Sequence, residues 1–228
     1  MKRLLFLFST FLTFSQLSFA QSDTICLNFQ STFNDEAMEL DKSYFLPSIN
    51  DSVTINAFRF YISDIQLIKA DKISYEIAEK AFLIDASAKS KVIFETDSVI
   101  EYDEIKFNIG IDSVTNVSGA LGGDLDPVKG MYWAWQSGYI NFKLEGKSLR
   151  CKTRNNLFQY HIGGYLPPYA SVKSVSFSVI DKSSLNLQFD VSKFLDQVDI
   201  STLNVVMSPS TKAVKLANQY QSLFSIKE

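Results

Sequence analysis

The stretch FRFYISDIQL, residues 58–67, decides the fold expected for this chain. Phe58, Phe60 and Ile62 occupy alternate positions, and the positions between them hold residues such as Arg59 and Ser63. In an extended chain successive side chains point to opposite faces. The alternation therefore predicts a β-strand with one face buried in a sheet.

The same period of two recurs along most of the chain, and a helical period occurs only near its end. Residues 213–224 keep helical spacing after a cap at Ser210 or Thr211. No βαβ rhythm, internal repeat or Pro/Gly-rich linker divides the chain. We therefore predict an all-β fold, a Greek-key-like antiparallel β-sandwich with one short C-terminal helix, in a single domain over residues 21–228. Strands are expected at 25–30, 58–67, 81–84, 105–111, 131–144, 158–162, 175–179 and 185–191, and the last two are expected to pair as a hairpin.

The first twenty residues have the features of a secretory signal peptide. Lys2 and Arg3 precede an apolar run over residues 4–17, and the small-x-small cleavage site Ser18–Ala20 follows it. Polar residues interrupt the run, and it is shorter than the roughly twenty apolar residues that span a bilayer. We expect cleavage near Ala20 and a periplasmic or secreted mature protein without a membrane span.

The scarcity of basic and catalytic side chains excludes several function classes. Lys plus Arg number 22 against 25 Asp plus Glu, and no basic run stands out, which argues against a nucleic-acid partner. The chain has one histidine and no G-x-S-x-G motif, and the glycines at 119–123 lack the spacing of a phosphate or dinucleotide loop. We expect a binding protein rather than an enzyme, since a hydrolase would need two carboxylates converging in a pocket.

One long loop offers oxygen ligands for a hard metal ion. No regular structure is predicted between residues 112 and 129, and loops of this length are often functional. Asp112, Asn116, Asp124 and Asp126 provide the oxygen atoms that Ca²⁺ binds in proteins. The alternative is a solvated acidic loop without a metal.

A second candidate metal site uses soft ligands. Cu(I) accepts imidazole and thioether groups, and His161, Met131 and Met207 carry them. The alternatives are a histidine whose hydrogen bonds are satisfied within the protein and methionines that fill the core. A typical zinc site would need His161 and both cysteines together.

Export to an oxidising compartment also bears on the two cysteines. Cys26 and Cys151 can form a disulfide there if their strands become neighbours. Two buried free thiols or soft metal ligands are the alternatives. A separation of 125 residues does not distinguish among these three arrangements.

Several short motifs occur in a characteristic order along the chain. They are FRFYISDIQL at 58–67, GMYWAWQSGY at 130–139 with LEG at 144–146, HIG at 161–163 and VMSP at 206–209. In this order they resemble the signatures of the MbnP-like family, which are exported copper-binding proteins named for a methanobactin-associated partner. The late helix with Leu223 and Phe224 is similar to the family's end, so the resemblance extends from about residue 25 to residue 224.

The resemblance implies an all-β periplasmic domain that binds copper. In characterised members a partner di-haem oxidase of the cytochrome c peroxidase type converts a tryptophan to kynurenine, and Cu(I) is held by that kynurenine and histidine. Trp133 and Trp135 are the only tryptophans, so the modification would use one of them. Family sites use more than one histidine, whereas His161 is the only one here, so Met207 and Met131 are the candidates to replace the missing imidazole.

Two functions remain open at this point. One is Cu(I) binding or handling. The other is a non-metal binding or interaction module that keeps the scaffold but lacks the copper ligands. The second function predicts unmodified tryptophans and an exposed aromatic or apolar patch.

Overall fold

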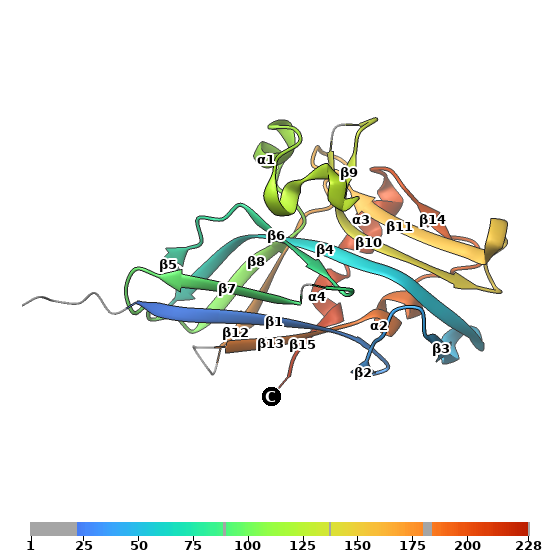
Figure 1. The fold of residues 1–228 in the computed structure, drawn as a ribbon, viewed down its shortest axis with the longest axis horizontal. Helices are drawn as coiled ribbons and strands as arrows, with labels where there is room; N and C mark the ends of the chain where they lie inside the picture. The colour runs from blue at the N-terminus through green and yellow to red at the C-terminus, as the bar shows by residue number, and fades with distance from the viewer. Residues whose placement is uncertain (1–21, 89, 137, 180–183, 228) are drawn as a thin grey trace, which may run out of the picture.

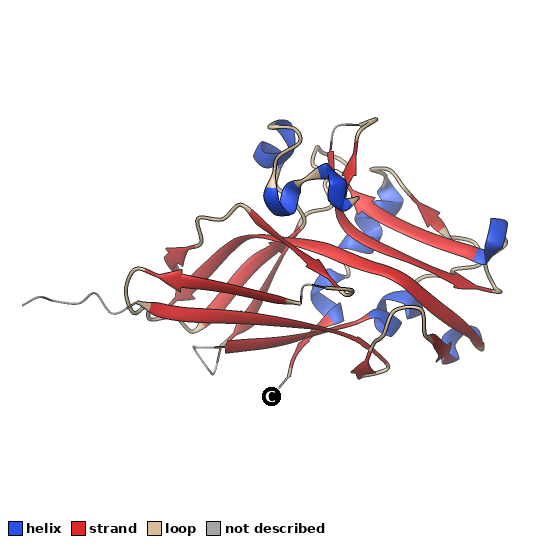
Figure 2. Ribbon diagram, viewed as in Figure 1, coloured by secondary structure: helices blue, strands red, loops and turns tan. Residues whose placement is uncertain are grey.

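The computed structural model describes residues 22–227, apart from residues 89, 137 and 180–183 (Figure 1). Strands dominate this part of the chain and the helices are short (Figure 2). The strands form two sheets, so the predicted all-β, sandwich-like fold is confirmed. The predicted signal peptide lies outside the described residues.

Counted over the described residues, the smaller sheet has five strands and the larger sheet has ten. The smaller sheet has the order β15-β13-β1-β2, with β7 also paired to β1. The larger sheet has the order β12-β8-β4-β10-β11-β14, with β3, β5 and β6 paired to β4 and β9 paired to β10. The smaller sheet comprises β1 (Asp23–Phe33), β2 (Glu36–Ala37), β7 (Lys91–Thr96), β13 (Ser184–Asp190) and β15 (Phe224–Ile226). The larger sheet comprises β3 (Ser43–Leu46), β4 (Asp51–Lys69), β5 (Lys72–Glu76), β6 (Ala81–Asp85), β8 (Glu104–Ile109), β9 (Tyr132–Trp133), β10 (Gly138–Ser148), β11 (Leu157–Gly163), β12 (Lys173–Ser178) and β14 (Val205–Val206).

β4 spans 19 residues and forms the centre of the larger sheet. Phe58 and Phe60 face the interior, and each is 1% exposed. The alternation then changes phase at Asp64, where φ is +48° and the register with β8 shifts. This bulge returns Ile65 and Leu67 to the interior, which explains why the sequence period skips one residue there.

Short helices connect and cover the strands. The α-helices of the described residues are α1 (Ser113–Val117), α2 (Val191–Asp196), α3 (Thr211–Ala217) and α4 (Tyr220–Leu223). Four 3₁₀ turns accompany them: η1 (Pro47–Ile49), η2 (Gly123–Leu125), η3 (Pro127–Lys129) and η4 (Arg154–Asn156). Among the described residues, no helix combines the length and the apolar character that crossing a bilayer requires.

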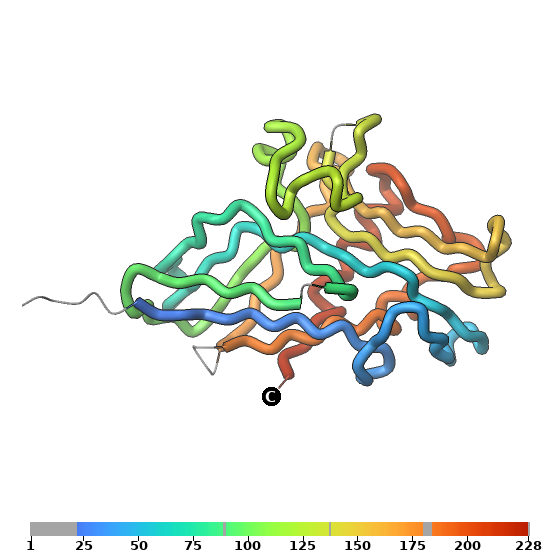
Figure 3. The backbone as a smooth tube through the Cα atoms, in the orientation of Figure 1, coloured from blue at the N-terminus to red at the C-terminus, as the bar shows by residue number. Residues whose placement is uncertain are grey.

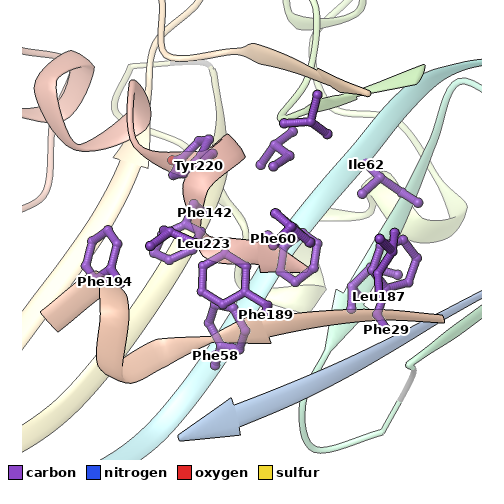
Figure 4. Packing of buried hydrophobic residues seen from close by; sticks show 14 of the residues in the cluster. Phe29, Phe58, Phe60, Ile62, Phe142, Leu187, Phe189, Phe194, Tyr220 and Leu223 are labelled. Atoms are coloured by element: carbon purple, nitrogen blue, oxygen red, sulfur yellow. The ribbon is translucent and has the colours of Figure 1, made fainter. Parts of the chain in front are cut away.

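The main core lies between the two sheets and is rich in aromatic rings (Figure 4). Phe58 of β4 and Phe189 of β13 join the sheets, with ring centroids 4.8 Å apart. Phe142 of β10 lies 5.4 Å from Phe58, and Tyr220 of α4 stacks on Phe142 at 5.2 Å. Burying each side chain of this size stabilises the fold by roughly 1.5–3 kcal/mol before the cost of ordering it is subtracted.

A second, smaller core lies on the opposite face of the larger sheet, which we term the outer face. The segment between β8 and β10 rises from this face (Figure 3). It contains α1, η2 and η3, although the sequence predicted no regular structure there. The buried members of the second core are Tyr61, Leu83, Ile111, Leu125, Met131, Trp133, Tyr139 and Ile140.

Three predictions about pairing and helices are wrong. β12 and β13 do not form a hairpin, because β12 pairs with β8 in the larger sheet and β13 runs parallel to β1 in the smaller one. β11 and β14 are also parallel, so the sandwich is mixed rather than wholly antiparallel. The single late helix is divided into α3 and α4, and α1 and α2 add two more. The physical reason is that alternation reports which face of a strand is buried and carries no information about its partner.

Candidate metal site on the outer face

Four adjacent strands place a row of polar side chains across the outer face. His161 of β11 pairs with Lys143 of β10, Lys143 pairs with Arg59 of β4, and Arg59 pairs with Asp85 of β6. Directly paired residues point to the same side of a sheet, so the four side chains lie side by side. At one end of the row Arg59 Nε lies 2.7 Å from Asp85 Oδ2, and at the other end lies the only imidazole of the protein.

His161 is held by a carboxylate on the neighbouring strand. Its Nε2 lies 2.6 Å from Glu145 Oε1, and the histidine is only 6% exposed. Lys143 Nζ lies 3.5 Å from the same carboxylate oxygen. The hydrogen bond from His161, followed by the charge of Lys143, lowers the pKa of Glu145 to about 2 although partial burial opposes the shift. Glu145 is therefore an ionised acceptor at neutral pH.

The second ring nitrogen of His161 remains available. In the described part of the chain Nδ1 of His161 makes no hydrogen bond. An ionised carboxylate only accepts hydrogen bonds, so Nε2 carries the proton that it shares with Glu145. In the neutral ring the lone pair then lies on Nδ1, which is the form that can bind a metal.

Met207 follows the short strand β14, which pairs with β11. The parallel pair of β14 and β11 sets Val206 opposite Tyr160, and Met207 is the next residue. The chain continues alongside β11 beyond this point, because a Cβ built on Gly164 would lie 2.9 Å from Pro209 Cβ. Met207 is 40% exposed, so its thioether is accessible from the solvent side.

Trp133 packs against the same strand close to His161. A Cβ built on Gly163 would lie 2.7 Å from Cζ3 and 3.0 Å from Cη2 of Trp133, so only glycine leaves room for the indole. Gly163 and His161 are two residues apart and face the same side of β11, with Cα atoms roughly 7 Å apart. Trp133 is 5% exposed, and its Nε1 is buried without a hydrogen-bond partner in the described residues. A buried N–H without a partner is rare and calls for an explanation.

The other two predicted residues of this region lie on either side of Trp133. Met131 is fully buried in the second core with Trp133, and its carbonyl accepts a hydrogen bond from the backbone N–H of Ile140 at 2.9 Å. Trp135 is 67% exposed, and its ring centroid lies 5.7 Å from that of Trp133. The two tryptophans thus form one aromatic pair with a buried and an exposed member.

The residues of the predicted calcium loop make contacts within the protein itself. Asp112 caps α1 by accepting from Thr115 N at 2.9 Å, and Asp126 caps η3 by accepting from Val128 N at 2.9 Å. Asp124 accepts from Lys129 Nζ at 2.6 Å. Across the described residues no three His, Cys, Asp or Glu side chains gather as a metal-binding group. In the structure these carboxylates stabilise the turns of the loop.

Asn116, the fourth residue of that prediction, is a structural tether. It is 2% exposed, and its amide donates to the carbonyls of Ile111 at 2.8 Å and Asp112 at 2.9 Å. Its Oδ1 accepts from Tyr139 N at 2.9 Å. Asn116 therefore joins the start of the loop to β10.

Cys26 and Cys151 are free thiols in the structure, so of the three arrangements left open by the sequence the disulfide is not the one formed. Cys26 lies half-buried in β1 of the smaller sheet, and its Sγ donates to Asn28 Oδ1 at 3.3 Å. Cys151 follows β10 and is fully buried, with Sγ 3.5 Å from the carbonyl oxygen of Ile200. Burial raises the pKa of the Cys151 thiol to about 11, which keeps it protonated.

Sequence reasoning missed the roles of Glu145 and Gly163. Both lie inside the motifs that carry the family resemblance, but no spacing rule links Glu145 to a residue 16 positions later. The contact depends on the register of β10 with β11. The signal that could have found Glu145 is the alternation in this strand, which places Lys143 and Glu145 together on its polar face.

The fold and these contacts define the class of the protein: a two-sheet, β-rich protein with a histidine–carboxylate pair, an exposed methionine and a buried tryptophan. Comparison with known proteins places it more closely. The MbnP family model matches residues 22–208, and the chain belongs to this family.

A solved structure supports the same fold. MbnP from Methylosinus trichosporium superposes with a TM-score of 0.66 at 15% sequence identity, over 86% of this chain and 88% of that chain. At this identity the similarity establishes the fold. No curated protein matches the chain.

Proposed function

We propose that this chain is an exported copper-binding protein that holds Cu(I) on the outer face of the larger sheet. His161 would supply the imidazole ligand through Nδ1, and Met207 would supply a thioether. The observation that carries the proposal is the His161–Glu145 pair at 2.6 Å, which leaves Nδ1 without a partner in the described residues. Met207 follows directly on Val206, which pairs with Tyr160, the residue before His161. Binding or handling of copper, rather than catalysis, is the proposed role.

The donor set fits a soft metal better than a hard one. Imidazole and thioether are ligands that suit Cu(I), whereas Ca²⁺ needs several oxygen ligands. The carboxylates predicted to bind Ca²⁺ are engaged as caps and in an ion pair with Lys129. The carboxylate behind His161 is typical of metal sites, in which the ligand histidine donates its other N–H to an acidic side chain.

We further propose that Trp133, rather than Trp135, is the tryptophan converted to kynurenine. Its Nε1 is buried without a partner among the described residues, and its ring lies on Gly163, two residues from His161. Kynurenine has an aniline nitrogen, which can act as a metal ligand where an indole N–H only donates a hydrogen bond. The conversion would be carried out by a partner di-haem oxidase of the cytochrome c peroxidase type. Trp135, which is 67% exposed, is positioned to contact such a partner first.

The test is a Cu(I) competition titration with a chromogenic chelator, under anaerobic conditions, on protein isolated from its own host grown with copper. His161→Ala is expected to abolish tight binding, and Met207→Leu is expected to weaken it roughly tenfold or more. Gln159→Ala is the matched control, because Gln159 lies two residues before His161 on the same face of β11. Met131→Leu, a volume-conserving change inside the second core, is expected to leave the affinity unchanged. Equal affinity in the wild type and His161→Ala would refute the site.

Peptide mass spectrometry of the same sample tests the modification. Conversion to kynurenine replaces one carbon by one oxygen, so the peptide gains the corresponding mass. We expect this change at Trp133, with Trp135 in the same peptide region as an internal control. The same spectrum also reports cleavage near Ala20, which tests export.

One observation favours a second candidate function, a non-metal interaction module. Exposed apolar side chains gather on the segment that covers the outer face: Val114 is 76% exposed, Val117 72% and Val128 85%, in addition to Trp135. Exposed apolar groups of this kind often mark a protein interface. Unmodified tryptophans together with no Cu(I) binding by the wild type would favour this function over copper binding.

A further inference from the structure

The neighbours of His161 determine which of its nitrogens can carry a proton. In the register of β10 with β11, the residue directly opposite His161 is Lys143, and the residue opposite Glu145 is Gln159. The Glu145 carboxylate nevertheless reaches diagonally to His161 Nε2 at 2.6 Å. Strand register alone would place the ammonium group of Lys143 next to the imidazole of His161. The Glu145 carboxylate contacts both groups and takes the position beside the imidazole.

Lys143 and Glu145 would have opposite effects on the ring. An ammonium group only donates hydrogen bonds, so a ring nitrogen that faces Lys143 directly would have to be the acceptor, without a proton. An ionised carboxylate only accepts, so the nitrogen that faces Glu145 must carry the proton. The carboxylate thus selects the tautomer with hydrogen on Nε2 and the lone pair on Nδ1.

Glu145 itself is held firmly enough to impose this choice. Lys143 Nζ lies 3.5 Å from Glu145 Oε1 and donates to the carbonyl oxygen of Gly130 at 3.4 Å. The side chain of Lys143 is 15% exposed and that of His161 is 8% exposed, so both partners of the carboxylate are shielded from solvent. The nearby Arg59 is engaged by Asp85 and by the carbonyl of Lys129.

We propose that Glu145 is a positioning residue that fixes His161 in the Nε2–H tautomer and so assigns Nδ1 as the metal-binding atom. The metal-binding role of Nδ1 in this inference rests on the proposed Cu(I) site. Its structural part, the choice of tautomer, concerns the metal-free protein and can be measured without copper. Removing a carboxylate that holds a metal-binding histidine in this way changes metal affinity by roughly 10–100-fold.

The experiment is ¹⁵N NMR of the imidazole in the metal-free protein, in mildly alkaline solution where an imidazole is neutral. The chain has one histidine, so a single pair of ring-nitrogen resonances reports the tautomer. The wild type is expected to show hydrogen on Nε2. Glu145→Ala is expected to lose this preference, and Glu145→Gln is expected to retain it in part because the amide oxygen still accepts a hydrogen bond. Gln159→Ala keeps the carboxylate and the lysine that holds it, and is the matched control with unchanged tautomer.

A Cu(I) titration of the same variants separates this inference from the proposed function. Glu145→Ala is expected to bind Cu(I) roughly 10–100-fold more weakly than the wild type, with partial recovery in Glu145→Gln. A wild-type ring with hydrogen on Nδ1 overturns the positioning role whether or not copper binds, and this result does not depend on any variant folding. A wild type with hydrogen on Nε2 that binds no Cu(I) supports the positioning role and overturns the proposed function.

Discussion

Replacing Gly163 by alanine tests the packing of Trp133 over the strand that carries His161. A Cβ at this position would lie 2.5 Å from the carbonyl oxygen of Tyr139 and 2.7 Å from Cζ3 of Trp133. The second distance is well below the roughly 3.5–4.0 Å at which two carbon atoms make their best contact, and the first is shorter still. The first obstacle is backbone in β10 and cannot rotate away, so the strand or the indole must move.

The expected cost follows from the behaviour of overpacked cores. An added methyl group in a well-packed core destabilises by roughly 1–3 kcal/mol. For a chain of this size, each kcal/mol lowers the melting temperature by roughly 2–4 °C. Urea unfolding, followed by circular dichroism, measures the loss of stability. Tryptophan fluorescence measures the displacement of Trp133, whose emission is expected to move to longer wavelength as its 5% exposure rises.

The matched control is Gly122→Ala. Gly122 has a negative φ of −91°, and a Cβ there meets nothing within 4 Å among the described residues. This substitution is expected to leave the unfolding midpoint and the emission unchanged. If Gly163→Ala unfolds at the same urea concentration as Gly122→Ala, the close packing of Trp133 on β11 is wrong.

Three further predictions concern the tether, the carboxylate and the thiols. Asn116→Ala leaves the backbone N–H of Tyr139 buried without its acceptor and should destabilise by roughly 1–3 kcal/mol in urea unfolding, whereas no loss would show that the tether is dispensable. Because the pKa of Glu145 falls from 4.5 to about 2 on folding, its stabilising contribution is complete above about pH 4.5 and is lost as the pH falls toward 2. Glu145→Gln should therefore flatten the dependence of the unfolding free energy on pH in that window, and an unchanged slope would contradict the pair with His161. A thiol reagent should label Cys26 in the native protein and Cys151 only after denaturation, and a protein that stays unlabelled in denaturant without reductant would instead contain a disulfide.

The sequence predicted best those strands that are buried on one face and polar on the other. β4, β8, β11 and β13 all have this pattern, and each lies where its alternation placed it. β7 was missed because the pattern is blurred: Ile93 is 55% exposed, whereas Thr96 is buried at 1%. An apolar residue on the outside and a polar one on the inside together cancel the period-two signal.

The alternation that predicts a strand does not predict which other strand it pairs with. β12 and β13 are consecutive and both alternate, and consecutive strands often pair. They do not pair here because β13 pairs with β1 in the smaller sheet, with Leu187 opposite Phe29. The pairing joins residues more than 150 positions apart, and no local pattern encodes it. The same limit applies to the proposed metal site, since the contact of His161 with Glu145 follows from strand register alone.

The acidic loop shows how one composition serves two different roles. Carboxylates spaced along a loop can gather around a cation, or each can accept from a nearby backbone N–H and cap a turn. Here Asp112 and Asp126 each cap a turn, and Asp124 binds Lys129, so their negative charge stabilises the loop. The stabilised segment covers the outer face with the second core, which buries Trp133 next to the strand of His161. The acidic residues thus contribute to the proposed copper site indirectly, because the loop that they hold in shape keeps water away from its aromatic side.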